Sequence, residues 1–135
     1  MGTLNVTTIA GLSGGFSDCN VQGEGTKTTN LSQGLCKAWL NYKGTSTTEV
    51  RDDFNISSVA DEAAGDYGVN YSNNMKNANY MINGTGEQLA SNATIEIVKN
   101  YSHAYTTSLT RIVSVQNSTI GGAVYVNFST HGDLA

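Results

Sequence analysis

Apolar and polar residues alternate along much of the chain after residue 35, and clusters of turn-forming residues separate the alternating runs. The clearest run is 66–71, in which Tyr67, Val69 and Tyr71 alternate with polar residues or glycine. A repeat of two residues is typical of a strand with one buried face. We therefore expect strands in the runs 35–42, 47–50, 54–59, 67–71, 80–82, 94–99, 109–115 and 123–128.

Turn signals lie between these runs. The segments Lys43–Ser46, Asp61–Gly65 and Asn83–Gln88 are rich in small or polar residues, and Gly121–Gly122 is a further turn. Asn83 and Gly84 follow an apolar run, which is a signal for a β-hairpin turn. Because exposed loops carry much of a protein's recognition, the first three segments are also candidate contact sites.

Residues 36–135 therefore predict an all-β domain, either a β-sandwich or a small barrel, because no stretch has a convincing helical period. Residues 1–35 differ in texture. They contain one aromatic residue, Phe16, and glycine, serine, threonine and asparagine recur throughout. This composition predicts an extended N-terminal arm that anchors the domain to partners.

The composition excludes several classes of function. Only 13% of residues are charged and the net charge is −4, with the few lysines and arginines scattered along the chain. A nucleic-acid-binding protein usually concentrates basic residues, so we expect no nucleic acid partner. No apolar run approaches the roughly 18 residues of a membrane-spanning helix, so we expect no membrane insertion. The opening residues also lack the pattern of a secretory signal.

Two cysteines and two histidines offer little metal chemistry. Cys19 and Cys36 form no CxxC pair, and we expect free buried thiols, with a disulfide as the alternative. His103 and His131 lack the spacing of a metal motif. We therefore expect no metal site and no cofactor.

Carboxylates cluster at Asp52–Asp53 and at Asp61, Glu62 and Asp66. Facing carboxylates can hydrolyse glycosidic bonds, which makes a polysaccharide depolymerase with Asp52, Asp53 and Asp66 one alternative. The favoured interpretation is an ordinary acidic turn at 61–66 and a local ion pair with Arg51, since Asp and Glu are common in turns. We expect no catalytic residues.

Aromatic residues are the other candidates for binding. Exposed aromatic rings beside Asn and Asp suit sugar contacts, whereas packing of sheets and subunits is the more ordinary use of such rings. The residues concerned are Trp39, Tyr42, Tyr67, Tyr71, Tyr80, Tyr101, Tyr105 and Tyr125.

A series of ordered motifs resembles one known family. The motifs are Lys37-Ala38-Trp39-Leu40-Asn41-Tyr42, Arg51-Asp52-Asp53-Phe54-Asn55-Ile56-Ser57-Ser58, Gly65-Asp66-Tyr67-Gly68-Val69-Asn70-Tyr71 and Ala78-Asn79-Tyr80. In this order they resemble the C-terminal β domain of tail fibres and related virion proteins of tailed bacteriophages, many from marine and cyanobacterial phages. The resemblance covers residues 36–83 well and continues loosely to the last strand.

This resemblance implies a non-enzymatic structural protein of the virion, a tail fibre or appendage that is assembled in the bacterial cytoplasm. It also implies a homotrimer that contacts a glycan or protein of the host surface, with other virion proteins bound through the N-terminal arm. Because only about 35 residues precede the domain, a capsid decoration or cement protein is an alternative. A carbohydrate-binding module or depolymerase is the other.

Overall fold

A computed structural model describes residues 20–22, 28–30, 34–87 and 95–135. The chain divides into two units, Met1–Leu35 and Cys36–Ala135. In the first unit, strand β1 (Asn20–Gln22) pairs antiparallel with strand β2 (Thr28–Asn30). Cys19 and most of the predicted arm lie outside the described residues.

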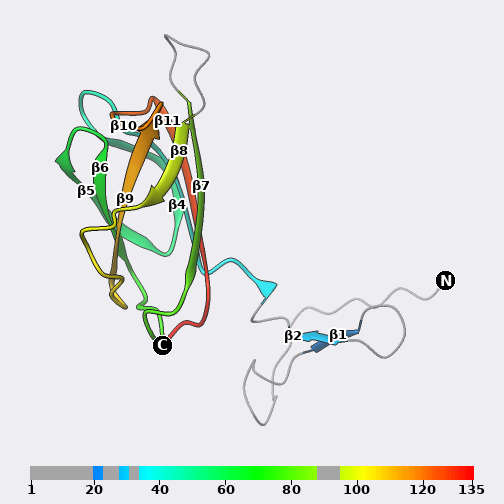
Figure 1. The fold of residues 1–135 in the computed structure, drawn as a ribbon. Coiled ribbons are helices and arrows are strands. Elements are labelled where there is room, and N and C mark those ends of the chain that lie inside the picture. The colour runs from blue at the N-terminus through cyan, green and yellow to red at the C-terminus, as the bar shows by residue number, and fades with distance from the viewer. Residues whose placement is uncertain (1–19, 23–27, 31–33, 88–94) are drawn as a thin grey trace. The chain divides into compact units, whose positions relative to one another are not determined.

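The second unit is one antiparallel sheet of nine strands, which confirms the all-β prediction (Figure 1). Strands are the only regular elements among its described residues. The order across the sheet is β4-β3-β11-β7-β8-β9-β6-β5, and β10 adds to β9. The strands are β3 (Ala38–Lys43), β4 (Glu49–Phe54), β5 (Ile56–Ala63), β6 (Asp66–Tyr71), β7 (Met81–Glu87), β8 (Ile95–Lys99), β9 (Leu109–Gln116), β10 (Thr119–Ile120) and β11 (Tyr125–His131).

The sheet curls into a barrel that is nearly closed, and its two edge strands, β4 and β5, follow each other directly in the chain. Asn55 makes the corner between them with a left-handed backbone (φ 60°). Its Nδ2 donates to the carbonyl oxygens of Lys37 and Asn73 at 3.0 and 3.1 Å, and its Oδ1 accepts from the Asn73 amide at 2.7 Å. Asparagine tolerates this conformation and here also fixes the surrounding chain.

The inward faces of the strands form the core. The alternation predicted for the runs 35–42 and 66–71 is confirmed on β3 and β6, since Leu40, Tyr42, Tyr67 and Val69 are fully buried. These two strands, β3 and β6, thus turn one face to the core and the other outward. The largest buried side chains are Tyr42, Tyr67, Leu40, Met75, Ile112, Val69 and Val126.

Tyrosine and threonine hydroxyls are bonded to one another inside this core. Tyr71 Oη lies 2.8 Å from Thr110 Oγ1 and 3.0 Å from Thr130 Oγ1, and so links β6 to β9 and β11. Tyr80 Oη reaches the same Thr110 hydroxyl and donates to the Thr106 carbonyl at 2.9 Å. Buried hydroxyls are costly unless paired, so this network fixes the packing of strands that are distant in sequence.

One predicted turn, at Asn83–Gly84, is wrong, and another, at 61–65, was predicted too long. Asn83 and Gly84 lie inside strand β7, not in a hairpin turn. A Cβ on Gly84 would lie 2.8 Å from the Cβ of Ile97, so this glycine provides room for β8. The turn predicted at 61–65 shortens to Ala64–Gly65, because residues up to Ala63 extend β5. Gly65 there has a φ of 77°, which glycine adopts without strain.

Among the described residues, no helix has the length and apolar character needed to cross a bilayer. Cys36 is a free thiol, and it is only half-buried where full burial was predicted. Its Sγ donates to the Ala38 carbonyl oxygen at 2.9 Å, next to the start of β3.

Candidate functional site

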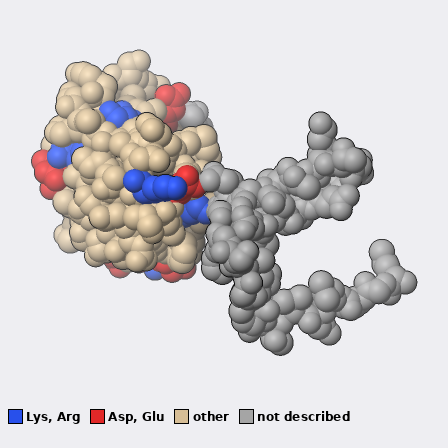
Figure 2. All heavy atoms as spheres, turned by 90° about the horizontal axis from the view of Figure 1, so that it is seen from below, with Lys and Arg blue, Asp and Glu red and all other residues tan. Residues whose placement is uncertain are grey.

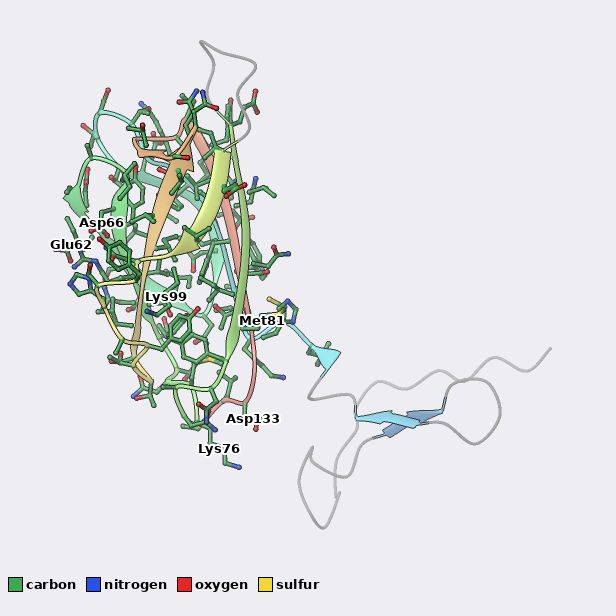
Figure 3. The ribbon with its side chains drawn as sticks, viewed as in Figure 1. Glu62, Asp66, Lys76, Met81, Lys99 and Asp133 are labelled. Carbon is green, nitrogen blue, oxygen red and sulfur yellow. The ribbon has the colours of Figure 1, made fainter. Side chains whose placement is uncertain are left out.

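The candidate carboxylates identified in the sequence lie on three different strands. Asp52 and Asp53 are exposed on edge strand β4, Asp61 and Glu62 are exposed on β5, and Asp66 begins β6. Glu62 and Asp66 lie near each other on the β5–β6 side of the barrel (Figure 3). Arg111 holds both, with Nη1 3.4 Å from Glu62 and Nη2 2.7 Å from Asp66.

Asp66 is the most strongly held of these carboxylates. Arg111 binds it with two hydrogen bonds, Nε to Oδ1 at 3.1 Å and Nη2 to Oδ2 at 2.7 Å, and Asn100 Nδ2 donates to Oδ2 at 2.9 Å. These bonds, those from Arg111 above all, lower the pKa of Asp66 below its ordinary value. Asp66 therefore stays ionised at neutral pH and joins β6 to β9, which is a structural role.

Two of the three candidate loops meet at one end of the barrel. Gly44, Thr45 and Ser46 from the first loop and residues 61–64 from the second line a shallow open hollow of about 480 Å³. Thr48 Oγ1 also donates to Asp61 Oδ2 at 3.2 Å, across the gap between the edge strands. The third candidate loop is different, since residues 83–87 belong to β7 and residue 88 lies outside the described residues.

The two histidines lie on different segments, and His103 is close enough to Asp66 to add to the lowering of its pKa by Arg111. His103 is exposed in the segment after β8, and His131 ends β11 opposite Met81. Among the described residues, no group of three or more His, Cys, Asp or Glu side chains is placed to hold a metal ion.

The eight aromatic candidates separate into two groups. Tyr42, Tyr67, Tyr71 and Tyr80 are buried and belong to the core. Trp39, Tyr101 and Tyr125 are exposed large side chains, and Tyr105 is partly buried against the core. Phe54 was not among the sequence candidates, yet it is 50% exposed. The alternation in β3 indicated that Trp39 points outward, but no sequence signal placed Phe54 beside it.

Three of these rings lie on one side of the sheet, which we call the outer face. The outer face comprises Trp39 and Asn41 on β3, Asp52 and Phe54 on β4, and Tyr125 and Asn127 on β11. The register places Trp39 opposite Phe54, and Asn41 opposite both Asp52 and Asn127. Opposed residues of an antiparallel pair share a face, so the strand pairing alone gathers these side chains.

Arg51 lies at one end of the outer face. Here β4 contains an irregularity in its register with β3, after the pair Asn41–Asp52. The Arg51 guanidinium lies 4.1 Å from the centre of the Tyr125 ring and donates to the Tyr42 and Val124 carbonyl oxygens at 3.3 and 3.2 Å. Tyr125 is therefore held in one orientation while 39% of it remains exposed.

Comparisons of this chain with models of protein families, with curated proteins and with solved structures found no match.

Proposed function

We propose that this chain is a structural subunit of a bacteriophage virion, a tail fibre or appendage protein that works as a trimer and attaches to the host surface or to the particle. The observation that carries the proposal is the exposed region around the two edges of the sheet. All six residues of β4 are exposed, and they include the apolar side chains of Val50 and Phe54.

An uncovered sheet edge exposes unpaired backbone groups and is a template for association. Exposed apolar groups that cluster, rather than scatter, are typical of interaction surfaces. A subunit of a larger assembly can bury both features against its neighbours. Assembly around a threefold axis therefore provides a physical reason for an edge like β4.

The motif resemblance supports the same function. The first three motifs fall on β3, on the β4–β5 corner and on β6, and their residues hold the barrel together. Asn55 fixes the corner, Asp66 pairs with Arg111, and Tyr71 joins the core network. Residues that hold a fold together form a pattern that is informative about the fold, and this is why we give weight to the resemblance.

The surface chemistry also suits close packing of chains. The net charge is −4 and charged residues are few. On the face seen in Figure 2, the charged side chains of the second unit are scattered over a mostly uncharged surface. Subunits with little charge repel each other weakly, which favours assembly of many copies.

A capsid decoration protein is the second candidate. The observation that favours it is the separate N-terminal unit with its own strand pair, β1 and β2, which offers a module for binding neighbouring capsid subunits. A depolymerase has less support, because Asp66 is committed to Arg111.

The experiment is immunogold electron microscopy of purified phage particles whose genome encodes this chain, with antibodies raised against the full chain. Label on tail fibres or appendages is the expected result. Label spread evenly over the head would favour the decoration protein. Absence of the chain from purified, infectious particles would contradict both virion roles.

A further inference from the structure

The outer face has apolar rings at its two ends and a polar row between them. Trp39 is opposite Ser129 on β11, and Tyr125 lies four residues earlier on that strand. At about 3.4 Å per residue, the two backbone positions lie about 14 Å apart along the strand direction. Trp39 is 37% exposed and Tyr125 is 39% exposed, so a ligand can reach both.

The row between the rings is made of amide, carboxylate and hydroxyl groups. Asp52, Asn41, Asn127 and Thr85 follow one another across strands β4, β3, β11 and β7. Asn41 Nδ2 donates to Asn127 Oδ1 at 2.6 Å, which orients both amides. The second polar atom of each amide remains for a ligand, an acceptor on Asn41 and a donor on Asn127.

The charges around this row disfavour a polyanion. Asp52 lies within the row, and Glu49 and Glu87 lie at its β4 and β7 sides. Lys43 and Arg51 are the cations nearby, and Arg51 is already engaged with Tyr125 and two carbonyl oxygens. Negative charges therefore exceed positive ones, and a neutral ligand rich in hydroxyl groups is the complement of this surface.

We propose that the outer face binds a neutral linear glycan. One pyranose ring stacks on Trp39, another packs near Tyr125, and the hydroxyls between them bond to the Asp52–Asn41–Asn127–Thr85 row. The spacing of about 14 Å between the two positions gives room for a short oligosaccharide. This inference rests on the attachment role proposed above and names the class of molecule that would be bound.

Trp39 makes the test direct, because it is the single tryptophan of the chain. The purified full-length protein is applied to an array of neutral linear oligosaccharides of glucose, galactose, mannose and N-acetylglucosamine. The oligosaccharide that binds is then titrated while tryptophan fluorescence is recorded. The expected result is saturable binding with a change in Trp39 emission.

Variants locate the site. Trp39→Ala and Asn127→Ala should each weaken binding by about tenfold or more, equivalent to about 1.4 kcal/mol. Tyr101→Ala is the matched control, because Tyr101 is 91% exposed and lies outside the outer face. It should leave the affinity unchanged. Circular dichroism verifies that each variant is folded.

Several results would overturn the inference. One is that the folded protein binds none of the neutral oligosaccharides. Another is that neither Trp39→Ala nor Asn127→Ala weakens the binding. The third is that the protein binds acidic glycans only. The solution mass is measured on the same samples. If Trp39→Ala dissociates an oligomer, the outer face is an interface between copies and the glycan proposal fails while the assembly proposal stands.

Discussion

Two buried tyrosines provide a matched test of the core. Tyr42 and Tyr67 are both fully buried, and their rings meet edge to face with centroids 5.1 Å apart. Their hydroxyls differ. Tyr67 Oη donates to the Gly44 carbonyl oxygen, whereas Tyr42 Oη has no hydrogen-bond partner among the described residues. Replacement by phenylalanine removes the same single oxygen from each ring.

The expected effects have opposite signs. Tyr67→Phe removes a hydrogen bond and leaves the Gly44 carbonyl group unpaired, which should lower the free energy of unfolding by about 1.5 kcal/mol. Tyr42→Phe removes a buried hydroxyl that has no protein partner, which should leave stability unchanged or raise it by up to about 1 kcal/mol. Burial raises the pKa of both hydroxyls, so both are neutral at pH 7 and no charge effect enters.

The assay is urea unfolding at pH 7, followed by circular dichroism, with the variants and the parent protein at one fixed concentration. A fixed concentration matters because association would stabilise the folded state by mass action. Tyr42→Phe should exceed Tyr67→Phe in stability by about 2 kcal/mol. If Tyr42→Phe lowers the free energy of unfolding by more than about 1 kcal/mol, the Tyr42 hydroxyl is hydrogen-bonded and the expectation is wrong.

Three further predictions concern the ion pair and two corners of the chain. Asp66→Asn should lower the free energy of unfolding by about 2 kcal/mol at pH 7. Folding depresses the pKa of Asp66, so its contribution is present above the unfolded value of about 3.8 and is lost as the pH falls toward the folded value. The unfolding free energies of parent and variant should therefore converge in acid below that unfolded value. Gly65→Ala should lower the free energy of unfolding by at least about 2 kcal/mol, since the new Cβ would lie 2.5 Å from the Gly121 carbonyl oxygen at a position with positive φ. Gly121→Ala is the control, because its Cβ meets no atom within 4 Å. It should lower the free energy of unfolding by less than about 1 kcal/mol in the same urea assay. In thermal unfolding, Asn55→Ala should be about 1 kcal/mol less stable than Asn55→Gly. Both variants lose the side-chain hydrogen bonds of Asn55, but only alanine is strained at a φ of 60°. Equal losses of stability in the two variants would contradict this expectation.

The strands that alternate strictly were predictable from local sequence. Tyr67, Val69 and Tyr71 lie inward on β6 as their spacing indicates, and Leu40 and Tyr42 do so on β3. The all-β class follows from such runs. The choice between a sandwich and a nearly closed barrel does not, because it depends on the pairing of strands far apart in the chain, such as β3 with β11.

Gly84 and Asp66 show why some of the turns and contacts could not be predicted from the sequence. Gly84 resembles a turn residue in the sequence, but its function is to make room for Ile97, which local sequence does not encode. Asp66 resembles a residue of an acidic turn, but Arg111 pairs with it from a strand 45 positions later. The outer face likewise exists only through the register that places Phe54 beside Trp39.

The most direct test of the proposed assembly is the solution mass of the purified full-length chain, measured by multi-angle light scattering with a no-boil denaturing gel alongside. We expect a single species with three times the chain mass of 14.3 kDa. A homogeneous monomer over the whole concentration range would contradict the trimer, and would leave the β4 edge uncovered in the isolated protein.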